Sequence, residues 1–193
     1  MSVSLVKGSK ISLNKEGGGS LSKVFLGLGW DVAKPKGFFA KLSAPESVDL
    51  DASCLVLDES KNVKDTVWFR QLKSKDGSIV HSGDNRTGEG DGDDEVITVD
   101  LTKLPAHAHH LVFTINSFTG QNFNSIENAT CRIVDSITNK ELGAYVLADK
   151  GSHNAQIMAV LSKVGSDWEF KAIGKSTSGR TIQDLVEEVV ASI

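Results

Sequence analysis

The sequence predicts an all-β fold, an antiparallel β-sandwich with a C-terminal amphipathic helix. Polar and apolar residues alternate with period two along most of the chain, and turn signals separate these runs. Helical spacing of apolar residues appears at the C-terminal end. The chain has 193 residues, of which 39% are hydrophobic and 24% charged, so we expect one globular domain over residues 1–193.

The predicted strands are short runs rich in β-forming residues, separated by turn signals such as Asp76-Gly77 and Gly165-Ser166. The apolar run 155–164 is compatible with a buried strand or a helix. Irregular segments are predicted at 31–47, 81–94 and 119–128, and long loops in compact domains are often functional. The predicted strands are residues 2–6, 10–13, 23–30, 48–57, 66–70, 96–101, 111–118, 129–134, 144–147, 155–164 and 167–173.

The last residues of the chain carry one apolar stripe with helical spacing. Thr181 followed by Asp184 resembles a capping box at the start of this helix. Because such stripes most often pack against their own domain, we expect the helix to dock on the sandwich. The stripe consists of Ile182, Leu185, Val186, Val189, Val190 and Ile193.

Composition and charge exclude several classes of function. The formal net charge of −4 argues against a nucleic-acid partner, which requires a basic surface. No leader sequence and no apolar run of membrane-spanning length is visible, so we expect a cytoplasmic protein without an integral membrane segment. Cys54 and Cys131 lie in apolar runs and are expected to be buried core residues.

The segment from Asp84 to Glu95, called the acidic segment below, is the most informative part of the sequence. It contains six carboxylates and one arginine, which gives a local charge of −5 within twelve residues. Carboxylates this close repel one another. A folded loop tolerates that repulsion if it remains well solvated or if it holds a cation.

The ligand chemistry of the acidic segment favours calcium over a solvated loop. Calcium takes six to eight oxygen ligands from carboxylates, amides and backbone carbonyls, and glycines let the backbone carbonyls turn inward. The segment has no histidine or thiol, which disfavours zinc and copper. It is not an EF-hand, because Glu89 stands where that loop needs glycine. The candidate ligands here are Asp84, Asn85, Gly88, Glu89, Asp91, Asp93, Asp94 and Glu95.

Three further acids lie outside the acidic segment. Asp31 follows an apolar run, and Asp49 and Asp51 are two residues apart on a predicted strand. Side chains two apart on a strand point to the same face, so these two carboxylates form either a solvated face or part of a cation site. From the residues alone the two interpretations are evenly balanced.

Several motifs resemble the TerD family, the tellurium-resistance and stress-response group, over nearly the whole chain. They are 2–5 with Lys7-Gly8, 27–31, 49–53 and 83–95, and the last is the most specific. The resemblance implies a calcium-binding β-sandwich, with Asp31, Asp49 and Asp51 as ligands beside the acidic segment. It also implies other tellurium-resistance proteins as partners in a complex. The run 51–54 is similar to the TerZ and TerX branches of the family.

Together these observations predict a calcium-binding sensor or scaffold that is not an enzyme. One alternative is a metal-dependent hydrolase that activates water with the bound ion. Another is an acidic interaction module that needs no ion. His81 adjoins the acidic segment, and a second group of histidines is expected at the surface. That group consists of His107, His109 and His110.

Overall fold

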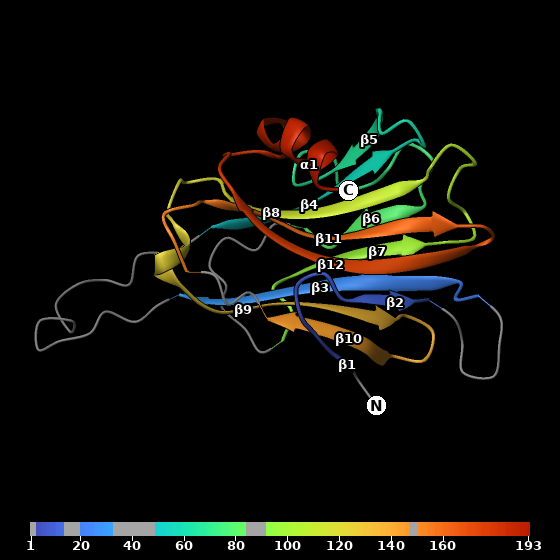
Figure 1. Cartoon of the computed structure of the whole chain (residues 1–193), viewed down its shortest axis with the longest axis horizontal. Coiled ribbons are helices and arrows are strands. Elements are labelled where there is room, and N and C mark those ends of the chain that lie inside the picture. Colours follow the sequence, from blue (N-terminus) through green and yellow to red (C-terminus); the bar gives the residue numbers. More distant parts are fainter. Residues whose placement is uncertain (1–2, 14–19, 33–48, 84–91, 147–149) are drawn as a thin grey trace, which may run out of the picture.

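The computed structural model describes residues 3–13, 20–32, 49–83, 92–146 and 150–193. Within these ranges the chain forms two six-stranded sheets that pack face to face (Figure 1), which confirms the predicted sandwich. The first sheet contains, in order, β1 (Val3–Leu5), β10 (Lys140–Val146), β9 (Ile126–Asp135), β3 (Lys23–Val32), β7 (Glu95–Asp100) and β6 (Ile79–His81). The second contains β2 (Lys10–Ser12), β12 (Asp167–Thr177), β11 (Ala155–Val164), β8 (His110–Ser117), β4 (Leu50–Leu57) and β5 (Val63–Val67).

The pairing departs from a fully antiparallel sandwich at one edge. β1 runs parallel to β10, whereas the other strand pairs in the described ranges are antiparallel. Between β1 and β2 the chain crosses from the first sheet to the second through a turn in which Ser9 N–H donates to the Val6 carbonyl. A strand that enters the sheet from such a crossing is not tied to its neighbour by a hairpin, so parallel pairing is possible.

Several local predictions differ from the structure or are settled by it. The ambiguous run 155–164 is a strand. The strand predicted at 66–70 ends at Val67, because Trp68 and Gln71 exchange backbone hydrogen bonds of 3.1 and 2.9 Å across a tight turn. The three-residue strand β6 was not predicted, and the segment 119–128 contains the 3-10 turn η2 (Phe123–Ser125).

The core lies between the sheets and continues beyond the second one. All eight residues of β4 are buried. Leu50, Ala52 and Cys54 belong to the cluster between the sheets, while Leu55 and Leu57 pack on the outer face against the C-terminal segment. A strand buried on both faces loses the simple alternation of a half-exposed strand. Cys54 and Cys131 are buried free thiols, as expected.

The C-terminal stripe forms the predicted helix and docks on the outer face of the second sheet. It consists of a 3-10 turn, η3 (Ile182–Leu185), followed by α1 (Val186–Ser192), and Ile182, Leu185 and Val189 are buried. Asp184 accepts the N–H groups of Thr181 and Arg180, each at 2.9 Å, as a capping box requires.

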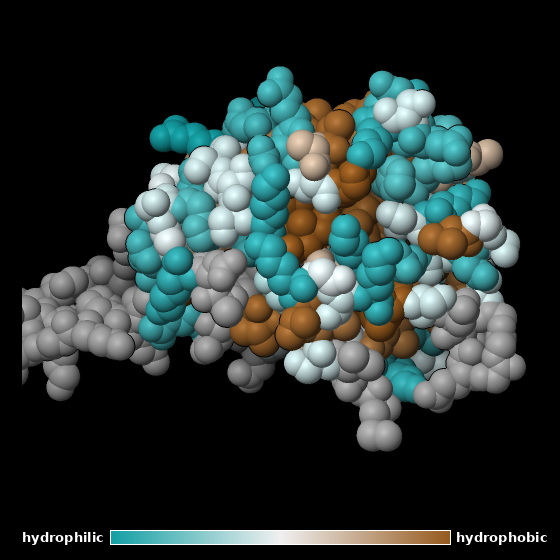
Figure 2. Space-filling model, viewed as in Figure 1, coloured by the Kyte–Doolittle hydropathy of each residue, from teal (hydrophilic) through white to brown (hydrophobic). Residues whose placement is uncertain are grey.

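The face seen in Figure 1 also shows how the surface is composed. In the space-filling view, apolar residues are visible in the middle of this face among hydrophilic side chains (Figure 2). No helix in the described ranges is long and apolar enough to cross a membrane.

Candidate functional site

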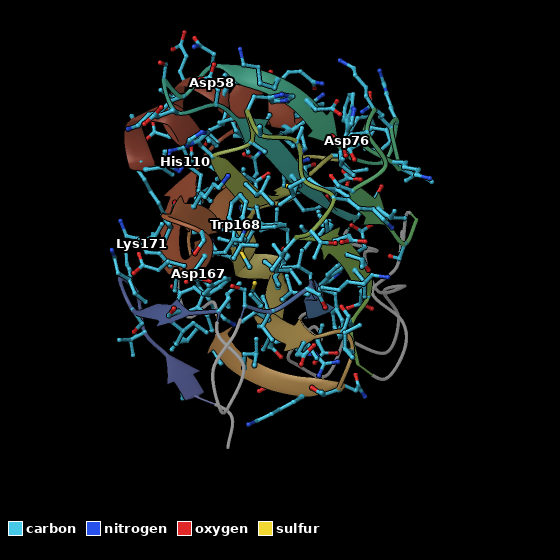
Figure 3. All side chains as sticks on the ribbon, turned by 90° about the vertical axis from the view of Figure 1, so that its right-hand side faces the viewer. Asp58, Asp76, His110, Asp167, Trp168 and Lys171 are labelled. Carbon is cyan, nitrogen blue, oxygen red and sulfur yellow. The ribbon has the colours of Figure 1, made fainter. Side chains whose placement is uncertain are left out.

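The acidic stretches of the sequence reach the same end of the sandwich. β3 ends there, while β7 and β4 begin there, on the left in Figure 1. Leu28 of β3 pairs with Glu95 of β7, and the backbone N–H of Ala52 in β4 donates to the Glu95 carboxylate at 2.7 Å. This bond joins the second sheet to the first at that end. Figure 3 views the opposite end, where Asp58, Asp76 and His110 lie.

Two glycines allow the end of the acidic segment to lie directly on β3. A Cβ atom at Gly27 would stand 2.1 Å from a carboxylate oxygen of Asp93. A Cβ atom at Gly29 would stand 2.7 Å from the carbonyl oxygen of Gly92. Neither separation is possible for a real side chain, so the pattern Gly27-Leu28-Gly29 makes room for the segment above it.

Asp93 is held by an arginine that the sequence reasoning did not single out. Its two oxygens accept hydrogen bonds of 2.8 Å from Nε and Nη2 of Arg132, a bidentate arrangement. Arg132 also lies 3.5 Å from Glu141. The hydrogen bonds that Arg132 donates to Asp93 raise the pKa of Arg132 despite the opposing effect of its partial burial, with Glu141 contributing further. An arginine within the apolar run of β9 was the signal available in the sequence.

Asp94 lies among other carboxylates and is fixed to the end of β3. Its N–H donates to the Leu28 carbonyl at 2.7 Å, and its Oδ2 accepts the N–H of Trp30 at 2.8 Å. Burial raises the pKa of Asp94, and the charges of Asp31, Glu95 and Asp93 raise it further, against the opposing hydrogen bond from Trp30. Negative charge at Asp94 is therefore unfavourable in the absence of a cation.

Glu95 points into the molecule and contacts His81. Both side chains are fully buried, with 3.3 Å between Glu95 Oε2 and His81 Nε2. Burial lowers the pKa of His81, but the hydrogen bond and charge of Glu95, with the Ala52 carbonyl and the charge of Asp51, raise it above its ordinary value. His81 Nδ1 accepts the N–H of Gly83 at 3.0 Å, an arrangement that suits the neutral ring tautomer with its proton on Nε2, facing Glu95 and the Ala52 carbonyl.

Asp49 and Asp51 lie at the start of β4 with 9% and 3% exposure. Because Leu50 and Ala52 face the core between the sheets, Asp51 is on the outer face of the second sheet. Asn116, its neighbour on β8, donates to Asp51 at 3.5 Å and to the Arg180 carbonyl at 2.6 Å. The solvated face considered for these two acids is therefore not what the structure shows.

The structure places some of the predicted ligands and not others. In the described ranges, no group of three or more histidine, cysteine, aspartate or glutamate side chains is arranged to hold a metal ion. Asp31 is exposed and acts on Asp94 through its charge. The predicted ligands Asp84, Asn85, Gly88, Glu89 and Asp91 lie outside the described residues.

Comparison with known proteins points to one family. The model of the TerD domain matches residues 1–188. The tellurium resistance protein TerZ of Serratia marcescens is 49% identical over 99% of this chain and 98% of its own length. The stress response protein SCP2 of Bacillus subtilis is 40% identical over 98% of this chain and 100% of its own length.

The solved structures support the fold. A homologue of the telluride resistance protein TerD from Streptomyces coelicolor superposes with a TM-score of 0.73 at 19% identity. The match covers 90% of this chain and 100% of that chain. At this level of identity the likeness concerns the sandwich architecture alone.

Proposed function

The chain belongs to the TerD family, and from this premise we propose that it is a calcium-binding protein of the tellurium-resistance and stress-response type. It acts as an ion-dependent sensor or scaffold. Other tellurium-resistance proteins are its partners in a complex.

The environment of Asp94 carries this proposal. This partly buried carboxylate lies close enough to Asp31, Asp93 and Glu95 for their charges to raise its pKa. The adjoining residues of the acidic segment add Asp84, Glu89 and Asp91. A cation at this end of the sandwich would offset the mutual repulsion of these groups, and the candidate ligands offer only oxygen atoms, as calcium prefers.

The described residues suggest a division of roles within the acidic segment. Asp93 and Glu95 already make close contacts with Arg132 and with Ala52 and His81, so they support the segment. Asp31 and Asp94 are at the end of β3 and are suited to contribute oxygens to the ion. The other proposed ligands are Asp84, Asn85, Gly88, Glu89 and Asp91, together with Asp49 and Asp51 at the start of β4.

Sensing follows from the charge of the acidic segment. Without an ion its carboxylates repel, and a bound calcium ion supplies the positive charge that removes this repulsion. A ligand that binds the native state stabilises it by about 2.7 kcal/mol at a hundredfold excess over its Kd. A change in ion concentration would thus change the shape and charge that this end presents to partners.

The test is calorimetric titration of the metal-free protein with calcium, repeated in excess magnesium, together with thermal melting in calcium and in chelator. We expect calcium to bind, to raise the melting temperature and to resist competition by magnesium. A melting temperature that is the same in chelator and in millimolar calcium would refute the proposal. Glu59→Gln is the matched control, because Glu59 is an exposed carboxylate in the turn after β4.

A second candidate is an acidic interaction module that needs no ion. The contacts of Asp93 with Arg132 and of Glu95 with Ala52 favour it, because they fix residues 93–95 without a metal. A basic partner would then bind equally well in chelator and in calcium. Loss of partner binding in chelator would favour the ion-dependent function.

We also propose that the chain is not an enzyme. The metal-dependent hydrolase remains the alternative, and it requires an open coordination position beside a substrate pocket. Assays of the calcium-loaded protein with ester and phosphoester substrates test this. Turnover that is lost in Asp31→Asn and retained in Glu59→Gln would establish the hydrolase instead.

A further inference from the structure

Arg132 lies where the first sheet leaves space for a long side chain. On β9 it pairs in register with Gly27 of β3 on one side and with Ala144 of β10 on the other. Neither neighbour has a side chain large enough to block the guanidinium. The group lies 5.8 Å from the centre of the Phe25 ring, a cation–π distance that helps to fix its position.

Asp93 occupies the complementary position above Gly27. All three carboxyl atoms of Asp93 lie between 2.1 and 2.4 Å from the place of a Cβ atom at Gly27. The Asp93 side chain is 10% exposed, whereas that of Arg132 is 37% exposed. A carboxylate buried to this extent needs a charged or hydrogen-bonding partner, and Arg132 supplies both.

We propose that Arg132 is a resident counter-ion of the acidic segment, which holds Asp93 on β3 and thereby keeps it out of the calcium shell. The first part of this proposal, the anchoring of the segment, is independent of any metal. The second part, the exclusion of Asp93 from the calcium shell, rests on the proposed function. Both Asp93 oxygens are engaged at 2.8 Å, so a metal ion would have to displace the bidentate guanidinium to use them as ligands.

The ion pair of Arg132 with Asp93 also determines the net charge of the acidic segment that attracts a cation. Arg132 neutralises one of the six carboxylates of the acidic segment. The anchored residues keep Asp94 N–H bonded to the Leu28 carbonyl at 2.7 Å, which holds the start of β7 in register. Arg132 is thus a positioning residue, since it acts on the segment through Asp93.

Hydrogen exchange in chelator tests the anchoring. The variants are Arg132→Gln, Arg132→Lys and Asp93→Asn, with Arg70→Gln as the control, because Arg70 contacts the rings of Trp68 and Phe69. We expect exchange of the Asp94 amide to accelerate on the order of tenfold in all three, as a charge-assisted hydrogen bond is lost. Arg132→Lys keeps the positive charge but loses the bidentate geometry, so this variant still tests the anchoring if Arg132→Gln folds poorly. Unchanged exchange in the three variants would overturn the anchoring.

Calcium titration tests the second part. Arg132→Gln should bind calcium on the order of fivefold more tightly, the order of magnitude expected when one nearby positive charge no longer repels a divalent ion in a water-like dielectric. Asp93→Asn should weaken binding by a similar factor, and the double variant should return to near wild-type affinity. A loss on the order of a hundredfold in Asp93→Asn that the double variant retains would show that Asp93 is a direct ligand. If the wild-type protein binds no calcium, the proposed function fails while the exchange experiment still decides the anchoring.

Discussion

The carboxylate of Asp93 occupies the space that a side chain at Gly27 would fill. The nearest oxygen lies 2.1 Å from the ideal Cβ position. The glycine of β3 and the aspartate of the acidic segment, which are far apart in sequence, are therefore one structural unit with Arg132. This contact explains why an otherwise apolar strand carries glycine at that position.

Gly27→Ala should destabilise the protein by about 1–3 kcal/mol, the usual range for forcing an extra methyl group into a filled site. The added methyl group displaces the Asp93 carboxylate from Arg132. Thermal or denaturant unfolding in chelator measures the loss. The matched test is Gly27→Ala in an Asp93→Ala background, where the cost should be smaller because the obstructing group is gone. Equal costs in the two backgrounds would contradict the proposed contact.

Glu95→Gln should destabilise the protein by about 1–3 kcal/mol, since a fully buried acceptor at the Ala52 N–H and His81 loses its charge. The loss should be the same in chelator and in calcium, because Glu95 supports the site from the interior. Unfolding of the variant and of the control Glu59→Gln in both conditions makes the comparison. A variant with normal stability in chelator that no longer responds to calcium would identify Glu95 as a ligand instead.

The cap of the C-terminal helix predicts a dependence on pH. Hydrogen bonds from the N–H groups of Thr181 and Arg180 lower the pKa of Asp184. A carboxylate with a depressed pKa contributes stability that is full above its unfolded pKa of about 3.9 and is lost as the pH falls through its folded pKa. Asp184→Asn should therefore cost stability at pH 7, and the difference from wild type should shrink below about pH 4. Denaturant unfolding of wild type and Asp184→Asn at pH 7 and below about pH 4 measures this, and a difference that stays the same at both would contradict the role of the Asp184 charge.

Much of the fold could be predicted from the sequence because alternation and helical spacing record which faces are buried. The C-terminal stripe predicted the buried positions Ile182, Leu185 and Val189. Periodicity could not predict the parallel pairing of β1 with β10, since strand direction depends on how the connection crosses between the sheets. Periodicity also predicted a strand at 66–70 where the structure has β5 at Val63–Val67, because the aromatic residues after Val67 resemble a strand although they form a turn.

The composition of the sequence could predict which segment forms the candidate site, but it could not predict which residues contact one another there. The density of carboxylates identified the acidic segment, and the resemblance added Asp31, Asp49 and Asp51. The partners of Asp93 and Glu95 come from strands distant in sequence, and no local spacing rule joins Asp93 to Arg132 or Glu95 to His81. These contacts distinguish carboxylates that support the segment from those that remain candidates for the ion.

Asp94→Asn separates stability from ion binding, and we expect opposite effects on the two. Burial and the charges of Asp31, Glu95 and Asp93 raise the pKa of Asp94, so its negative charge destabilises the metal-free protein at neutral pH. The amide keeps an oxygen that can accept the Trp30 N–H, so the variant should melt at a higher temperature than wild type in chelator. In calcium the order should reverse, because one ligand charge is missing. Melting of both proteins in chelator and across a calcium series measures this, with Glu59→Gln expected to follow wild type throughout. A variant that is less stable in chelator would show that the Asp94 charge is already compensated, and the cation site would then have to lie elsewhere in the acidic segment.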